Sequence, residues 1–244
     1  MPTRRVVLVV AACVALSACG AQPVDDRPTV RIAPAVQPAQ AIDLGGFLPS
    51  LQDMAATLAT GPDGFMAPAV QGGPDMLLRS VGEAQAAPAD CVGAPYRLQH
   101  VVYRGSPVVS VASTSWSGGG FDADPVSAYV GVVQMSSPAA ARDFFAATTD
   151  RWRRCAGQTV SLQRPGLGVG ELSRVTDVAF DNRVLSATVL HVSAGAQSPT
   201  AQRAVGVAGD CVVDVEVVDP RVGGDGRAAV AVTGLVLERI AAQR

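Results

Sequence analysis

The chain has 244 residues, with 19 arginines, no lysine and 21 acidic residues, and 48% of its side chains are hydrophobic. Without the two arginines that precede an N-terminal apolar run, 17 basic residues remain and the net charge is −4. This balance argues against nucleic-acid binding, which needs a clustered basic face, and against a polybasic grip on anionic lipid. The length suits one globular domain with a tether, and the aromatic content of 5% predicts a core of Val, Leu and Ala.

The N-terminus has the layout of a bacterial secretory signal with a lipid-attachment site. Two arginines precede a short apolar run, which ends in Leu16-Ser17-Ala18-Cys19. The run from Val6 to Ala18 has 13 residues, well short of the roughly 20 that an uncut transmembrane helix needs. We therefore predict a lipoprotein signal peptide over residues 1–18. Cys19 would then carry a diacylglyceryl group and acyl chains such as palmitate, which anchor the chain on the extracytoplasmic face of the cell membrane.

Residues 19–40 are rich in proline and show no apolar period, which predicts a disordered tether. The folded domain is expected over residues 41–244. Ser50 has the residue type of a helix N-cap and precedes apolar residues at helical spacing, and Gly61 ends this helix. A second short helix is expected to start at Pro74.

From Pro95 onward, runs of β-branched and aromatic residues alternate with short turns, which predicts strands. A helix with one apolar face opens at Ser137-Pro138 and runs to about Arg154, and another covers Ala228–Ala242. Short turns favour antiparallel pairing, and the helices do not alternate regularly with the strands. The fold class is therefore α+β, with an antiparallel β-sheet packed against helices. The expected strands cover 98–103, 107–116, 126–135, 159–163, 172–180, 184–192, 203–207 and 211–218.

After removal of the signal peptide, three cysteines remain beside Cys19, and export to an oxidising compartment favours a disulfide, so one thiol is left over. Spacing alone leaves open whether Cys91 pairs with Cys155 or with Cys211. Alternation along the last strand places Cys211 with three valines on one face and two acidic residues on the other. We therefore expect Cys211 to be a buried and unreactive thiol.

No catalytic or metal-binding pattern stands out in the sequence. His100 and His191 both lie in expected strands without partners at zinc spacing, and no Gly-x-Ser-x-Gly motif of serine hydrolases occurs. Two segments rich in Asp and Gly lack the carboxylate spacing of calcium loops. We therefore expect no metal, no cofactor and no enzymatic activity. Trp152 is expected in the core, whereas Trp116 precedes a glycine-rich loop and is a candidate for a cleft wall.

Six short segments occur in a fixed order: Cys91, Val102-Tyr103-Arg104-Gly105-Ser106, Ala139-Ala140-Ala141, Trp152-Arg153-Arg154-Cys155-Ala156-Gly157, Gln202-Arg203-Ala204-Val205 and Val212-Val213-Asp214-Val215. Together they resemble the PknH-type extracellular sensor domain. That domain is the outer part of some actinobacterial Ser/Thr receptor kinases and also occurs as freestanding lipoproteins. The resemblance covers roughly residues 44–243, and this chain, which has no lysine, carries no kinase module.

The resemblance implies an antiparallel sheet and packed helices around a large cleft, with ligand binding proposed and the ligand unknown. It also implies that Cys91 pairs with Cys155. The family's second disulfide would fall at Ala201 and Val218, so both of its cysteines are absent together.

We expect a non-enzymatic, lipid-anchored sensor-like domain of the actinobacterial envelope, which binds an unknown small or lipophilic ligand in a cleft. The expected lining residues are Trp116, Phe121 and Tyr129, with a charge from Arg104. One alternative is a module that docks on an envelope protein through an exposed apolar patch. The other is an unrecognised envelope hydrolase, which requires a titratable pair with a shifted pKa in a pocket.

Overall fold

The computed structural model describes residues 39–61, 63–82, 85–119, 125–164, 168–181, 183–193, 196–197, 199–221 and 226–244. The predicted signal peptide, Cys19, nearly all of the predicted tether and Phe121 lie outside these residues. Pro38–Arg244 form one compact unit, which contains the sheet and three buried apolar clusters. This unit therefore has its own core and can fold without the first 37 residues.

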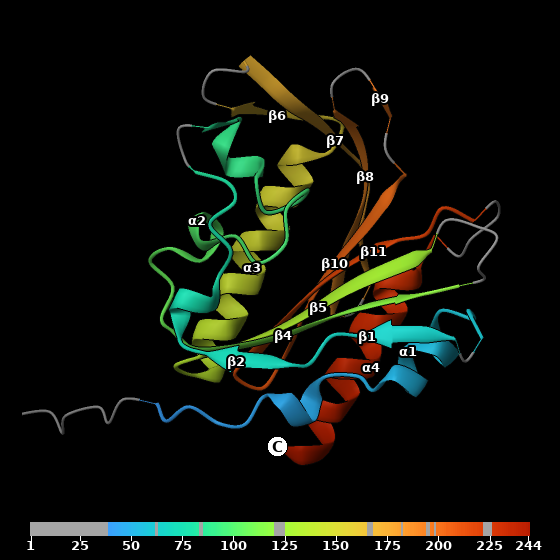
Figure 1. Cartoon of the computed structure of the whole chain (residues 1–244). Coiled ribbons are helices and arrows are strands. Elements are labelled where there is room, and N and C mark those ends of the chain that lie inside the picture. Colours follow the sequence, from blue (N-terminus) through green and yellow to red (C-terminus); the bar gives the residue numbers. More distant parts are fainter. Residues whose placement is uncertain are drawn as a thin grey trace, which may run out of the picture. The chain divides into compact units, whose positions relative to one another are not determined.

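All described strands belong to one antiparallel sheet of eleven strands (Figure 1). Their order is β1-β4-β5-β11-β10-β8-β7-β6-β3, with β2 also on β4 and β9 also on β8. Hairpins join β4 to β5, β6 to β7, β7 to β8 and β10 to β11, and β11 pairs with β5 in the middle of the sheet. The strands are β1 (Gly64–Met66), β2 (Val70–Gly72), β3 (Ala86–Ala87), β4 (Val108–Gly118), β5 (Val126–Met135), β6 (Thr159–Arg164), β7 (Gly168–Asp181), β8 (Val184–Ser193), β9 (Ala196–Gln197), β10 (Ala201–Ala208) and β11 (Cys211–Val218).

Helices cover both faces of the sheet (Figure 1). One face carries α3 (Pro138–Cys155) and α2 (His100–Tyr103), and the other carries α4 (Ala228–Gln243) and α1 (Leu51–Thr57). Alternate residues of β11 show this division, because Val213 packs on the α4 side and Val212 on the α3 side. Three short 3-10 helices complete the described elements: η1 (Gly45–Phe47), η2 (Pro74–Met76) and η4 (Ala89–Cys91).

The α+β class is confirmed. The expected helices begin where the sequence places them, after Ser50, at Pro74, at Pro138 and at Ala228, although the one at Pro74 is a single 3-10 turn. Ser50 caps α1, with its hydroxyl accepting from the Asp53 backbone N–H at 3.2 Å and its own N–H donating to the Asp53 carboxylate at 2.7 Å. Ser137 caps α3 with its hydroxyl, which accepts from the N–H of Ala140 at 3.1 Å, without the reciprocal bond. The local signals of the sequence were sufficient at both positions.

The strand expected over residues 98–103 is wrong, and with it the placement of His100 in a strand. Leu98 has a φ of 47°, and His100 begins the short helix α2. The Leu98 backbone N–H donates to the Asp214 carboxylate at 2.9 Å, and the His100 N–H donates to the carbonyl of Leu78 at 2.7 Å. These long-range contacts outweigh the β propensity of the segment, which covers the sheet instead of extending it.

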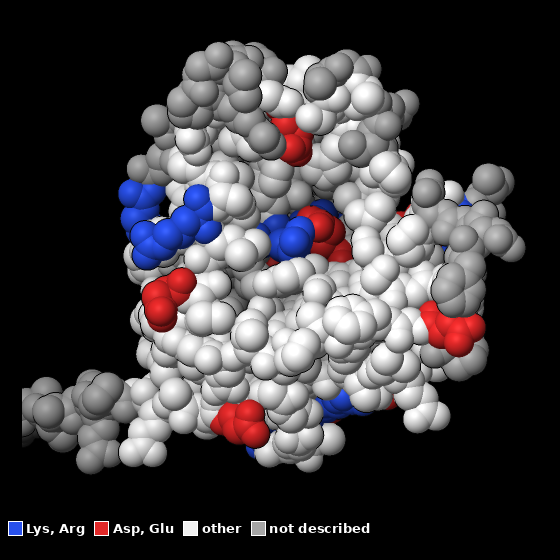
Figure 2. All heavy atoms as spheres, in the orientation of Figure 1, with Lys and Arg blue, Asp and Glu red and all other residues white. Residues whose placement is uncertain are grey.

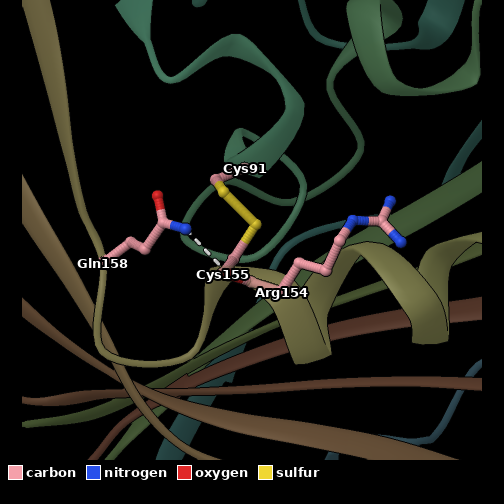
Figure 3. The surroundings of a disulfide bond; sticks show 4 residues. All are labelled: Cys91, Arg154, Cys155 and Gln158. Carbon is pink, nitrogen blue, oxygen red and sulfur yellow. Dashed lines mark hydrogen bonds between the residues drawn. A yellow bond between two sulfur atoms is a disulfide. The ribbon is translucent and has the colours of Figure 1, made fainter.

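Cys91 and Cys155 form a disulfide, with their Cα atoms 5.6 Å apart (Figure 3). It joins the end of η4 to the end of α3. Beside it, the side-chain amide of Gln158 donates to the Arg154 carbonyl at 2.8 Å. Cys211 is free and fully buried, as expected, and burial raises the pKa of its thiol to about 12.

The register of the β10–β11 hairpin places Ala201 directly opposite Val218. These are the two positions at which the resemblance places the missing second disulfide. Residues opposite each other in an antiparallel pair have Cα atoms about 4.5–5.5 Å apart, which is within the range of a disulfide. The strand register therefore agrees with the two positions that the resemblance implies.

Candidate functional site

A buried ion pair holds the irregular segment before α2 against the sheet. Arg203 on β10 is fully buried, and its guanidinium lies 2.8 Å from the Asp214 carboxylate on β11. Arg203 also donates to the carbonyl oxygens of residues 93 and 94, at 3.3 and 3.1 Å, and Asp214 accepts from the Leu98 N–H and the Tyr103 hydroxyl. Burial and the charge of Asp214 raise the pKa of Tyr103 well above its usual value. The pair thus anchors three points of this segment.

Two adjoining hollows lie next to this segment, with volumes of about 470 and 240 Å³. Both are lined by Arg97, Glu216 and Val218. Arg97 and Glu216 form an ion pair, and the Arg97 guanidinium lies 4.1 Å from the centre of the Tyr129 ring. Figure 2 shows a hollow near the middle of this face, in which basic and acidic atoms lie side by side. We call the two hollows together the Arg97 groove.

A hydrogen-bonded cluster borders the larger hollow. Glu171 on β7 accepts through one oxygen from the Tyr96 hydroxyl and lies near His191 Nδ1 on β8, both at 3.1 Å. Ser173 contacts the same ring nitrogen at 2.8 Å. The hydrogen bond with His191 is the main cause that lowers the pKa of Glu171, against the opposing effect of burial. Glu171 is therefore held as a carboxylate at the edge of the groove.

Ser173, His191 and Glu171 have the residue types of a hydrolase triad, but their arrangement differs from one. In a triad, the serine hydroxyl bonds to Nε2 of the imidazole while the carboxylate holds Nδ1–H. Here the Ser173 hydroxyl and the Glu171 carboxylate both contact Nδ1, and Ser173 is fully buried. The pocket thus contains the titratable pair that the hydrolase alternative requires, without an exposed nucleophile facing Nε2.

Trp116 and Tyr129 both border the smaller hollow, but they come from opposite faces of the sheet. Cross-strand partners share a face, and Trp116 pairs with Ala128 whereas Ser115 pairs with Tyr129. The Trp116 side chain is only 2% exposed and packs in the cluster under α4. Its role in binding stays a prediction, and the structure gives it a packing role.

Of the other predicted site residues, Arg104 lies away from the groove. Arg104 lines a separate hollow of about 180 Å³ beside Trp152 and Arg151 on α3. Trp152 itself is 2% exposed, as expected for a core residue. Phe121 lies outside the described residues. The single large cleft therefore stays a prediction, because the predicted lining residues that the structure describes divide between separate hollows.

Sequence reasoning missed the charged residues of the groove, namely Arg97, Glu171 and Glu216. Alternation along β11 places Glu216 on the face opposite Val215, so one signal was present in the sequence. Arg97 lies between helical turns with no period to locate it, and Glu171 meets His191 only through the register of β7 and β8. Among the described residues, no group of three or more His, Cys, Asp or Glu side chains could hold a metal ion.

The fold is that of an α+β domain, with an antiparallel sheet, helices on both faces and a disulfide that joins a loop to a helix. The family model of the PknH-like extracellular domain matches residues 39–239. The chain belongs to this family of extracellular domains. In the part of the chain that the structure describes, no helix is long and apolar enough to cross a membrane.

Relatives and a solved structure agree with this assignment. The chain is 31% identical over 128 residues to the serine/threonine-protein kinase PknH of Mycobacterium bovis. The matched segment covers 52% of this chain and 20% of that protein. PknH of Mycobacterium tuberculosis gives the same identity over 19% of its length, so the chain spans about a fifth of these curated relatives. The crystal structure of the extracellular domain of PknH from M. tuberculosis matches with a TM-score of 0.67 and 20% identity, covering 84% of this chain and 97% of that one. That likeness shows the shared fold.

Proposed function

We propose that this protein is a lipid-anchored, extracytoplasmic sensor-like domain that binds a small or lipophilic ligand in the Arg97 groove and catalyses no reaction. The groove carries the proposal, because it combines a concave site with a partly exposed ion pair in a member of an extracellular-domain family. The side chains of Arg97 and Glu216 are 31% and 17% exposed to solvent. A ligand can therefore reach both charges without opening the core.

The lining residues favour a ligand with a polar head and an apolar part. Arg97 offers donors, and the carboxylates of Glu171 and Glu216 offer acceptors for hydroxyl or amine groups. At the other end, Phe65 lines the smaller hollow and is 70% exposed, and the Tyr129 ring lies beside it in the lining. The groove thus pairs hydrogen-bonding groups with aromatic surface, as small-molecule sites commonly do.

The hydrogen-bonded cluster at His191 supports binding over hydrolysis. Ser173 is fully buried and shares Nδ1 with Glu171, so it lacks the exposure and the Nε2 contact that a nucleophile needs. Ser173→Ala is expected to leave ligand occupancy nearly unchanged. Turnover of ester substrates that Ser173→Ala abolishes would instead establish the hydrolase alternative.

Native mass spectrometry of the domain from residue 38, secreted from an actinobacterial host, tests the binding site. Wild type is expected to carry a defined extra mass that leaves on unfolding. Arg97→Met with Glu216→Gln should lower the occupancy at least tenfold, at about 1.4 kcal/mol for each factor of ten. Arg104→Met is the matched control, because Arg104 lines a different hollow.

Two results would count against the groove. Extra mass that survives in the Arg97 and Glu216 variant would place the ligand elsewhere. A bare wild-type mass would favour docking on an envelope protein, for which the exposed Phe65 is the first residue to substitute.

The lipid anchor is tested separately in the full chain. Wild type is expected to fractionate with membranes and to incorporate labelled palmitate, because the segment before Cys19 has the layout of a lipoprotein signal. Cys19→Ser should abolish the incorporation. Labelling that persists in Cys19→Ser would show that the lipid is attached at another residue.

A further inference from the structure

A further hollow, of about 700 Å³, lies at the end of the domain where the described chain begins and ends (Figure 1). Three arginines line it: Arg142 in the second turn of α3, Arg183 just before β8, and Arg244 just after α4. Val207 and Ala241 add apolar surface to the same lining. We call this site the arginine hollow.

The positive charge of the arginine hollow is only partly balanced. Asp210 is the carboxylate in the lining, and it forms an ion pair with Arg244 at 2.7 Å. Arg142 and Arg183 are exposed, and neither forms an ion pair with any residue that the structure describes. Guanidinium groups bind phosphate oxygens through paired N–H donors, so two unpaired arginines at a concave site favour a phosphate-bearing ligand.

The arginine hollow also adjoins the point where the predicted tether joins the domain. The side-chain amide of Gln134 donates to the backbone carbonyl of Gln40 at 3.1 Å and to the Asp210 carboxylate at 3.2 Å. The Ile42 N–H donates to the same side chain at 3.2 Å. Residues 19–40 lead from this point back to Cys19, so the hollow lies at the end of the domain that the predicted anchor reaches first.

We propose that the arginine hollow binds the phosphate group of anionic phospholipids, so that this end of the domain rests on the membrane surface. Charge complementarity selects the anionic headgroup, and the apolar side chains of Val207 and Ala241 line the same hollow. Composition argues against a polybasic segment, but the tertiary structure gathers these arginines at one hollow. The net charge of −4 does not oppose such a local contact, because interactions between exposed charges fade over a Debye length of about 8–10 Å.

This contact would also orient the Arg97 groove. The hollow includes Ala208 next to the turn of the β10–β11 hairpin, whereas the groove includes Ala201 and Val218 at the open end of that hairpin. Seven residues of strand, at about 3.3 Å each, separate the two sites by roughly 23 Å. A domain that rests on the arginine hollow therefore holds the groove away from the membrane.

Partitioning of the domain from residue 38 onto vesicles tests the proposal without using Cys19. We compare vesicles of phosphatidylcholine alone with vesicles that contain one third phosphatidylglycerol. Each arginine near an anionic surface contributes roughly a fivefold change in partitioning, so Arg142→Glu with Arg183→Glu should lower binding to anionic vesicles by about 30-fold or more. Raising the salt concentration should weaken the wild-type binding.

The matched control is Arg154→Glu with Arg174→Glu, which makes the same change in net charge at two exposed positions outside the hollow. It is expected to lower partitioning about twofold at most. An equal loss in both double variants would show that net charge alone acts, and would overturn the proposal. Wild-type partitioning that is the same for neutral and anionic vesicles would overturn it as well.

Soluble glycerol phosphate separates the two sources of a phosphate group. The membrane assignment predicts weak binding of the soluble compound and strong binding to anionic vesicles. The opposite result is that wild type binds glycerol phosphate but not the vesicles, and that the Arg142 and Arg183 variant no longer binds glycerol phosphate. The hollow would then bind a free phosphate ester, and the membrane assignment would be wrong. This test is independent of the Arg97 groove, so the ligand-binding proposal can fail without affecting it.

Discussion

The two faces of the sheet are held by different means. On one face, Val232 and Val236 of α4 pack against Val213 of β11 in a regular apolar pattern. Under α3, an irregular segment is fastened by the disulfide and by the buried pair of Arg203 and Asp214. A periodic helix needs only apolar burial, whereas a segment without regular structure must have its backbone groups paired by side chains. The Arg97 groove borders the second kind of face, so polar anchors position the candidate site.

The largest expected effect comes from breaking the buried ion pair. Asp214→Asn leaves the Arg203 charge without its partner in the core, and we expect a loss of about 3–5 kcal/mol in the free energy of unfolding, measured with urea. Arg203→Met with Asp214→Leu should recover much of this loss, since apolar replacements of buried pairs are often neutral. A cost below about 1 kcal/mol for Asp214→Asn would contradict the importance of this anchor.

The disulfide is the second anchor of the irregular face. Its cysteines are 64 positions apart, and loop entropy gives an upper figure of about 4 kcal/mol for such a separation. Cys91→Ala with Cys155→Ala should therefore lower the free energy of unfolding by about 2–4 kcal/mol. A reductant should destabilise wild type by a similar amount and leave the double variant unchanged. An effect of reductant on the double variant would point to Cys211 instead.

The regular face can be tested at a close packing contact. A Cβ atom at Gly118 would lie 2.3 Å from the Trp116 ring, so Gly118→Ala should cost about 1–3 kcal/mol through overpacking. Gly234→Ala on α4 is the matched control, because nothing lies within 4 Å of its added Cβ. Alanine also suits a helix better than glycine, so this control should be neutral or stabilising by up to about 1 kcal/mol. Similar losses at both positions would contradict the packing assigned to Trp116.

The smallest expected effect concerns the groove and its pH dependence. Hydrogen bonding with His191 lowers the pKa of Glu171 below its usual 4.5, so the stability from this contact is complete above that pH and is lost as pH falls through the lowered pKa. Urea unfolding from neutral to acidic pH should therefore show a steeper decline for wild type than for Glu171→Gln. The difference should be less than about 1 kcal/mol, because the pair is partly exposed. Parallel pH curves would remove this role from Glu171.

The two faces also differ in how far local sequence patterns predict their structure. The regular face follows from local patterns, including the alternation that buries Cys211 and the helix expected over 228–242. On the irregular face, the β propensity of residues 98–103 misleads, because Asp214 on a distant strand holds Leu98 with a φ of 47°. Local preference decides structure where packing is periodic, and long-range polar contacts decide it elsewhere.

The candidate site shows the same limit. Tyr129 was a predicted lining residue and lies in the groove beside Arg97, whereas Trp116 turns its side chain to the opposite face. One residue of strand register separates these outcomes, and register is set by pairing across the sheet.

By itself, the sequence determined the α+β class, the capped starts of α1 and α3, the burial of Cys211 and the resemblance to an extracellular domain family. Each of these depends on neighbouring residues or on the order of motifs along the chain. Only the tertiary structure decided which charges meet: Arg97 with Glu216, Glu171 with His191, and three arginines around one hollow. These residues are far apart in the chain and approach one another through strand pairing and helix packing, for which no local pattern exists.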